Sequence, residues 1–114
     1  MEIKHDNYQI TYDPTTVSIT CSGSLRLSHQ GYEPIIELLN KVAETQPDTL
    51  TIDLRRLRFL NSFGLGIIAR FAMRLEQQQT RLIVSASSAF PWQKKALRTL
   101  SRLAPGLALR FDQA

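Results

Sequence analysis

The order of strand-like and helix-like segments constrains the fold of this chain more than any other feature. After residue 32, segments with helical periodicity alternate with short apolar segments rich in β-favouring residues. Strands separated by helices favour a parallel sheet, because joining parallel strands needs a long crossover, and such crossovers are right-handed. We predict an α/β fold in the order β-β-α-β-α-β-α-β, with a mixed sheet and the helices packed on it.

The sheet is expected to begin with an antiparallel hairpin. Tyr8, Ile10 and Tyr12 alternate with polar residues, and the same alternation returns from Val17 to Cys21 after the turn residues 13–16. Alternation with period two on both sides of a turn is typical of a hairpin. Gly23 is expected to end the second strand.

Periodicity also places the helices. Apolar residues at i, i+3, i+4 and i+7 predict an amphipathic helix between Pro34 and Pro47. The other expected elements are helices over about 63–79 and 92–103 and strands over 50–54, 81–86 and 107–111.

Size and composition indicate one domain over residues 1–114, with 43% hydrophobic residues. The lone Cys21, the absence of a signal-peptide pattern and the absence of a long apolar run lead us to expect a cytoplasmic protein without a membrane span. The net charge is +4, and the basic residues are dispersed, with apparent core residues between them. This arrangement favours solvated faces over a basic binding patch. Nucleic-acid binding is the weaker hypothesis and would depend steeply on salt.

The stretch FLNSFGLG, residues 59–66, sets a serine and two glycines between a strand and a helix. Gly64-x-Gly66-x-x-Ala69 fits the loose dinucleotide fingerprint, in which a glycine directly follows a strand. We reject that hypothesis for two reasons. The strand is predicted to end near Leu54, and no acidic residue occurs at the end of the next strand, residues 84–86.

Enzyme chemistry has little support. Ser62 lacks the G-x-S-x-G pattern of a nucleophile elbow, and neither histidine, His5 or His29, shows a recognisable spacing to it. No cluster of Cys, His, Asp or Glu suggests a metal site. We predict no catalytic residue, no metal and no cofactor.

Ser62 or Asn61 can cap the predicted helix, and a phosphate on Ser62 would lie beside the free N–H groups of that helix. Such a phosphate would place negative charge next to Phe63. The helix carries apolar residues on two sides, for which a wide core contact is favoured over a partner surface. These are Phe63, Ile67 and Phe71 on one side and Leu65, Ile68, Ala69 and Ala72 on the other.

The chain resembles the STAS-domain family of bacterial anti-sigma factor antagonists over nearly its whole length. The resemblance rests on Gly23-Ser24-Leu25, on LTIDLRRLRFLNSFGLG and on SAFPWQKKALRTLSRLAPGLALRF. It implies that Ser62 is phosphorylated, that a serine kinase acting as an anti-sigma factor binds the unmodified protein, and that a phosphatase reverses the switch. The residues it assigns to partner binding are Asn61, Ser62, Phe63, Gly64, Leu65, Gly66, Ile67, Ser24 and Arg26.

Four features depart from the family pattern. Asn61 and Arg26 stand where acids are usual, Phe63 replaces a hydroxyl residue, and the usual C-terminal helix is expected to be missing, which would favour dimerisation. Two hypotheses therefore stay open: a partner-switching regulator controlled by Ser62, and a constitutive interaction or scaffold domain, possibly dimeric or ligand-binding, without phosphorylation.

Overall fold

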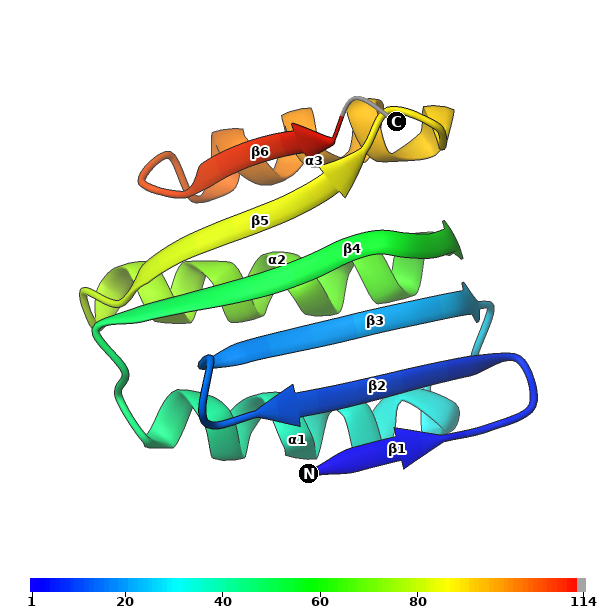
Figure 1. The fold of residues 1–114 in the computed structure, drawn as a ribbon, viewed down its shortest axis with the longest axis horizontal. Helices are drawn as coiled ribbons and strands as arrows, with labels where there is room; N and C mark the ends of the chain where they lie inside the picture. The colour runs from blue at the N-terminus through cyan, green and yellow to red at the C-terminus, as the bar shows by residue number, and fades with distance from the viewer. Residues whose placement is uncertain (113–114) are drawn as a thin grey trace.

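A computed structural model describes residues 1–112 as one six-stranded sheet with helices on a single face (Figure 1). The strands lie in sequence order across the sheet, and a 3₁₀ turn over Gln30–Tyr32 leads into the first helix. The strands are β1 (Glu2–Lys4), β2 (Tyr8–Asp13), β3 (Ser18–Leu25), β4 (Thr49–Leu60), β5 (Arg81–Ser87) and β6 (Ala108–Asp112). The helices are α1 (Glu33–Glu44), α2 (Ser62–Gln77) and α3 (Pro91–Leu103).

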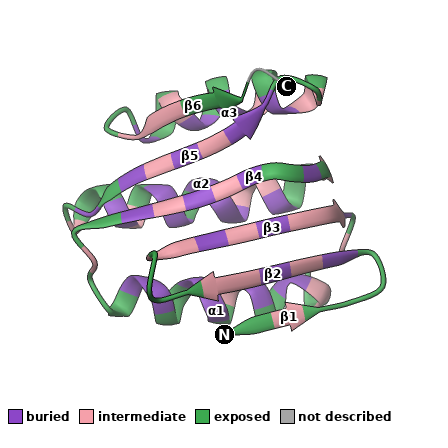
Figure 2. Cartoon of the chain, viewed as in Figure 1, coloured by how far each residue is buried: buried purple, intermediate pink, exposed green. Residues whose placement is uncertain are grey.

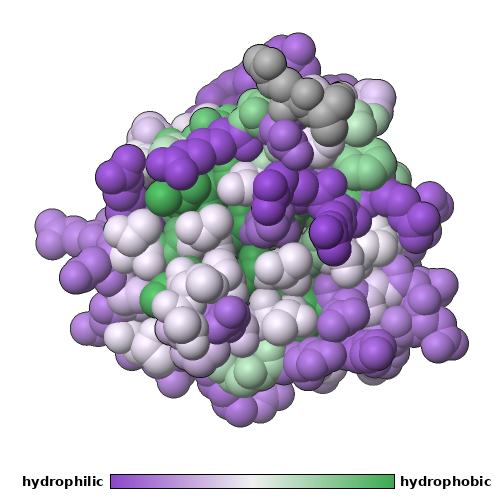
Figure 3. Space-filling model, in the orientation of Figure 1, coloured by the Kyte–Doolittle hydropathy of each residue, from purple (hydrophilic) through white to green (hydrophobic). Residues whose placement is uncertain are grey.

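The strand order explains why the helices share one face. β1, β2 and β3 pair antiparallel, whereas β3 to β6 pair parallel through the crossovers that contain α1, α2 and α3. Each crossover advances one strand in the same direction, so right-handed connections place every helix on the same side. The opposite face of the sheet is free of helices and carries mostly neutral and hydrophilic side chains (Figure 3).

The predicted mixed α/β fold is confirmed, with two corrections near the N-terminus. A short strand, β1, precedes the expected hairpin and pairs with Gln9–Thr11. Gly23 does not end the second strand, because β3 continues to Leu25. Gly23 instead has φ +88°, and a Cβ there would run into the carbonyl oxygen of Asn7. Glycine thus lets the β1–β2 turn approach β3, where the Ser24 N–H donates to that carbonyl at 2.8 Å.

β4 is more than twice as long as the strand predicted over residues 50–54, because two irregularities hide its periodicity. The β3–β4 register shifts between Thr20 and Ser22 and again between Gly23 and Ser24, and each time β4 contributes one extra residue. Beyond Leu54 the buried positions, Leu57 and Leu60, are therefore spaced by three rather than two. A strand with that spacing loses the alternation by which a strand is identified in sequence.

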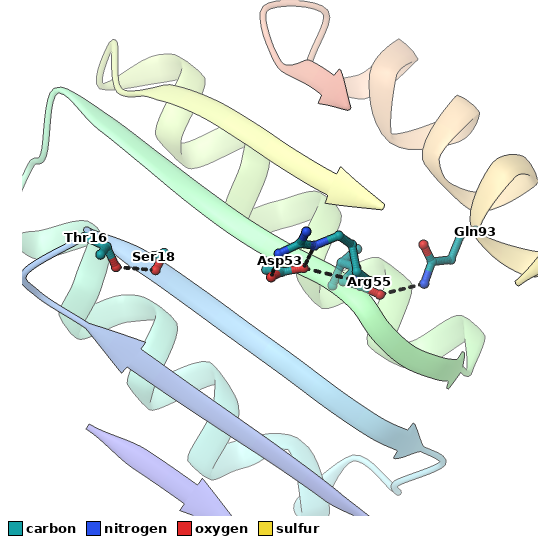
Figure 4. Close-up of polar contacts among 6 residues, drawn as sticks. Thr16, Ser18, Asp53, Arg55 and Gln93 are labelled. Carbon is teal, nitrogen blue, oxygen red and sulfur yellow. Dashed lines mark hydrogen bonds and ion pairs between the residues drawn. The ribbon is translucent and has the colours of Figure 1, made fainter. Parts of the chain in front are cut away.

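An ion pair stabilises the first irregularity of β4 (Figure 4). The Asp53 carboxylate accepts the backbone N–H of Arg55 at 3.0 Å and its guanidinium N–H groups at 3.0 and 2.9 Å. The side-chain hydrogen bond to Arg55 is the main cause that lowers the pKa of Asp53, and burial acts against it. Asp53 therefore stays ionised at the point where β4 bends.

Gln93 ties α3 to the fork between β4 and β5. These strands stop pairing after Asp53 and Ser85, and the fully buried Gln93 side chain lies beyond that point. Its amide donates to the carbonyls of Leu54 at 2.7 Å and Leu57 at 2.9 Å, and its oxygen accepts from the Ser87 N–H at 2.8 Å. One side chain thus satisfies three backbone groups that would otherwise be buried without partners.

The core lies between the helices and the sheet (Figure 2). On α2, Ile67, Ile68 and Phe71 are all buried, so the wide core contact predicted for this helix is confirmed. Phe63 is the exception and is 41% exposed. Within residues 1–112, no helix is long and apolar enough to cross a membrane.

Candidate functional site

The start of α2 lies at the edge of the sheet where β3 and β4 end. β4 stops at Leu60, and α2 begins at Ser62 with Asn61 as its N-cap. The Asn61 N–H donates to the Leu25 carbonyl at 3.1 Å, which fixes the end of β3 against the helix start. Within the stretch FLNSFGLG, Asn61 is thus the single residue that connects the central strand β4 to α2.

The Asn61 side chain organises this connection. Its Oδ1 accepts the Gly64 N–H at 2.9 Å and lies 2.6 Å from the Tyr32 hydroxyl, while its Nδ2 donates to the Leu27 carbonyl at 3.0 Å. Tyr32 is buried, and burial is the main cause that raises the pKa of its hydroxyl, so this group stays neutral and can donate. Asn61 therefore joins the helix start, the loop after β3 and the segment leading into α1.

Of the two possible caps, the structure selects Asn61 and leaves Ser62 free. Ser62 is the first residue of α2 and is exposed. Within the described residues its hydroxyl has no hydrogen-bond partner, whether histidine or backbone N–H. The hydroxyl is thus accessible at the positive end of the helix dipole.

Phe63 is exposed yet held between two rings. It stacks with Tyr32 at a centroid distance of 5.9 Å and an angle of 9°, and the His29 ring meets it edge-on at 5.2 Å. The structure therefore brings His29, which sequence spacing did not connect to the site, to within contact of the residue after Ser62. These rings fix a large apolar side chain at the surface.

The two glycines of α2 serve different purposes. A Cβ on Gly64 would collide with the Tyr32 hydroxyl and the side chain of Leu60, whereas a Cβ on Gly66 would meet nothing within 4 Å. Gly64 is therefore a packing residue that lets the start of α2 approach Tyr32 and the end of β4. Among residues 1–112, Gly66 has no neighbour that requires glycine.

Several residues predicted to bind a partner are buried or half-buried in this structure. Gly64 and Ile67 are buried, and Leu65 is half-buried against the core. Their apolar pattern serves the helix–sheet contact. The accessible members of the predicted set on α2 are Ser62, Phe63 and the backbone at Gly66.

Ser24 and Arg26 lie at the same edge of the sheet. They flank Leu25, whose carbonyl binds the Asn61 N–H. The Arg26 guanidinium lies over the Phe59 ring, 4.2 Å from its centroid, at a position where the family usually has an acid. This cation–π contact holds the Arg26 guanidinium against Phe59 of β4.

One argument against dinucleotide binding was wrong, since β4 continues to Leu60 and no long loop precedes the helix. The absence of an acidic residue at the end of β5 still stands. The residue that directly follows β4 is Asn61, and both glycines lie within α2.

A protein-family model matches most of the chain. The STAS domain model matches residues 9–102, and the chain belongs to the STAS-domain family. The search of curated proteins gave no match.

Solved structures share the fold at low sequence identity. A chain of the complex of diguanylate cyclase SiaD with its activator SiaC from Pseudomonas aeruginosa has a TM-score of 0.72 at 14% identity, over 98% of this chain and 99% of that chain. An anti-sigma factor antagonist from Mycobacterium paratuberculosis has a TM-score of 0.62 at 23% identity, over 95% and 82%. The phosphorylated form of the Bacillus cell fate determinant SpoIIAA has a TM-score of 0.61 at 22% identity, over 90% and 89%.

Proposed function

We propose that this protein is a partner-switching regulator of the anti-sigma factor antagonist type, controlled by phosphorylation of Ser62. The observation that carries the proposal is the pairing of an accessible Ser62 hydroxyl with Phe63, which is 41% exposed and held between two rings. The structures that share the fold include an anti-sigma factor antagonist and a phosphorylated SpoIIAA. They support the proposal by analogy, since a fold alone does not set a function.

Phe63 would act as the anchor of the protein interface. Aromatic side chains held in one conformation supply large contact area at little entropic cost, and they dominate many interfaces. Gly66 would allow close approach of the partner backbone, since its Cα faces open space one helical turn after Ser62. The proposed partner is a serine kinase that doubles as an anti-sigma factor, with a phosphatase to reverse the reaction.

Phosphorylation would act on this interface through charge. A phosphate on Ser62 adds nearly two negative charges at the start of α2, where the free N–H groups and the helix dipole favour an anion. The same dianion beside Phe63 would have to be desolvated on binding, so the phosphorylated protein should release its partner.

Two variants of one residue test the proposal. Affinity-tagged wild-type, Ser62→Ala and Ser62→Asp proteins are recovered from the native cells, and the partner they retain is identified and its affinity measured. We expect Ser62→Ala to keep the partner and Ser62→Asp to bind it at least tenfold more weakly. Thr99→Asp, which makes the same change at an exposed residue of α3, is the matched control and should bind like wild type.

Mass spectrometry of the Ser62 peptide across growth and stress conditions tests the modification itself. Phosphate on Ser62 under any condition supports the switch. Unmodified Ser62 throughout, together with full partner affinity of Ser62→Asp, would overturn it.

One observation favours a second candidate, a constitutive interaction or scaffold domain. The family's usual acid is replaced by Asn61, whose side-chain oxygen and nitrogen both make structural hydrogen bonds. A scaffold without phosphorylation would bind its partner equally with Ser62→Ala and Ser62→Asp. Sedimentation of the purified protein would show whether that scaffold is a homodimer.

A further inference from the structure

A hollow lies at the edge of the sheet where β3 and β4 end, on the side of the β1–β2 turn. It has a volume of about 470 Å³, within the range of small-molecule sites. His5 lines it from the β1–β2 turn, Ser24 and Arg26 from the end of β3, and Arg58 from β4. We call these four residues and the space between them the arginine pocket.

Two features of β3 and β4 build this pocket. Gly23, at φ +88°, lets the β1–β2 turn lie against β3 and form one wall. Arg58 is the extra residue of the second irregularity of β4, between the pairs Gly23–Leu57 and Ser24–Phe59. A regular ladder would neither bring the turn so close nor insert Arg58 at this position.

The charges of the pocket are unbalanced. It contains two guanidiniums against one carboxylate, Asp6. Within residues 1–112 the ion pairs join Lys41 to Glu37 and Arg55 to Asp53, so neither Arg26 nor Arg58 is neutralised by a salt bridge. Arg26 is held by the Phe59 ring, and the His5 ring stacks on Tyr8 at 4.9 Å.

This donor set matches a phosphate group better than a carboxylate. Guanidinium groups bind phosphate through paired N–H donors, and the Ser24 hydroxyl and His5 imidazole supply further donors. A carboxylate needs only one guanidinium, whereas a phosphate monoester presents three acceptor oxygens. Tyr8 and Leu27 add apolar lining for the organic part of a ligand.

We propose that the arginine pocket binds a small phosphate monoester through Arg26 and Arg58. The site is separate from the Ser62 hydroxyl and requires neither a protein partner nor phosphorylation of this chain. The pocket and the helix start are joined through Leu27, which lines the pocket and whose carbonyl accepts from Asn61.

The test is a titration of the ¹⁵N-labelled protein with glycerol 3-phosphate, followed by amide chemical shifts at constant ionic strength. Glycerol serves as the uncharged control and inorganic phosphate as the minimal anion. We expect saturable shifts at the amides of Asn7, Ser24 and Leu27, with at least tenfold weaker binding in Arg58→Ala. Arg26→Gln, a second variant that keeps most of the stem, should weaken binding as well.

Arg98→Ala is the matched control, because it removes the same charge from an exposed residue of α3. Wild-type affinity in this variant, with loss in Arg58→Ala, supports the pocket. Equal affinity in wild type and Arg58→Ala, or shifts that grow without saturation near every arginine, would mean adventitious anion contacts only and would overturn the proposal. This titration contains no partner protein. The pocket proposal can therefore fail while the Ser62 switch holds, and the Ser62 switch can fail while the pocket binds phosphate.

Discussion

Two neighbouring residues at the start of α2 divide the tasks that one sequence motif suggests. Asn61 supplies the structure, through the cap on Gly64 and the bonds to Tyr32 and Leu27. The Ser62 hydroxyl makes no hydrogen bond within the described residues and is accessible for modification. Stability and the proposed switching can therefore be tested separately by substitution.

We predict that Asn61→Ala lowers the free energy of unfolding by about 2 kcal/mol, because the variant loses the helix cap and leaves the Tyr32 hydroxyl with a weaker partner. Ser62→Ala should change it by less than about 0.5 kcal/mol. Urea denaturation of both variants with unchanged slope measures the difference. Similar losses in the two variants would show that Ser62 shares the cap.

The Asp53–Arg55 pair predicts a small pH dependence of stability. Because the folded-state pKa of Asp53 is lowered, its contribution is present above the unfolded pKa of about 3.9 and is lost as the pH falls through the folded pKa. At pH 7 the free energy of unfolding of wild type should exceed that of Asp53→Asn by no more than about 1 kcal/mol, because solvent screens the ion pair. In urea titrations the gap should close as the pH falls through the lowered folded-state pKa of Asp53, and Asp48→Asn, at an exposed site, serves as the control. A gap that widens on acidification would contradict the assignment.

At the scale of elements, α2 shows how one helix meets the needs of a core and of a surface. Its sheet side buries Ile67, Ile68 and Phe71, while its first turn exposes Ser62 and Phe63. Glycine within a helix lowers its stability, so each glycine needs a reason. For Gly64 that reason is packing, whereas the described part of the chain gives no packing reason for Gly66.

We predict opposite effects of the same substitution at these two glycines. Gly64→Ala should destabilise the protein by about 1–3 kcal/mol, because the new methyl group overlaps Tyr32 and Leu60. Gly66→Ala should stabilise it by up to about 1 kcal/mol through helix propensity. Thermal and urea unfolding measure both. If Gly66→Ala also weakens partner binding, Gly66 is retained for contact; unchanged binding would remove it from the interface.

At the scale of the whole molecule, the sheet depends on a residue outside it. β4 pairs with β5 only as far as Asp53, and Gln93 of α3 bridges the fork that opens beyond this point. This contact joins α3, β4 and β5 where backbone pairing ends. The same strand, β4, ends at Leu60, just before Ser62 begins α2.

We predict that Gln93→Leu lowers the free energy of unfolding by about 3 kcal/mol, because it leaves three backbone groups buried without partners. The amide of Ser87 should exchange with solvent much faster in this variant. Gln77→Leu, on the exposed end of α2, is the matched control and should change stability by less than about 0.5 kcal/mol. A neutral Gln93→Leu would mean that water or rearranged backbone replaces the amide.

Local pattern was sufficient for most elements, because their periodicity reflects one buried face. The hairpin from Tyr8, the helix after Pro34 and the order of the later strands follow from that pattern, and Ser62 was found from the residues around it. The pattern failed at β1, which is only three residues long, and beyond Leu54, where two extra residues in β4 change the spacing of its buried positions.

Sequence by itself thus determined the α/β order and the serine at the strand–helix junction, since both depend on residues close together in the chain. Only the tertiary structure decided which residue caps α2, why Gly64 and Gly66 differ, and that Phe63 is held by Tyr32 and His29. It also decided that Arg26 and Arg58 line one pocket and that Gln93 bridges β4 and β5 where their pairing ends. Apart from the cap itself, which joins Asn61 to Gly64, these features depend on groups about 30 residues or more apart in sequence or on an exposure set by packing, and no local periodicity encodes them.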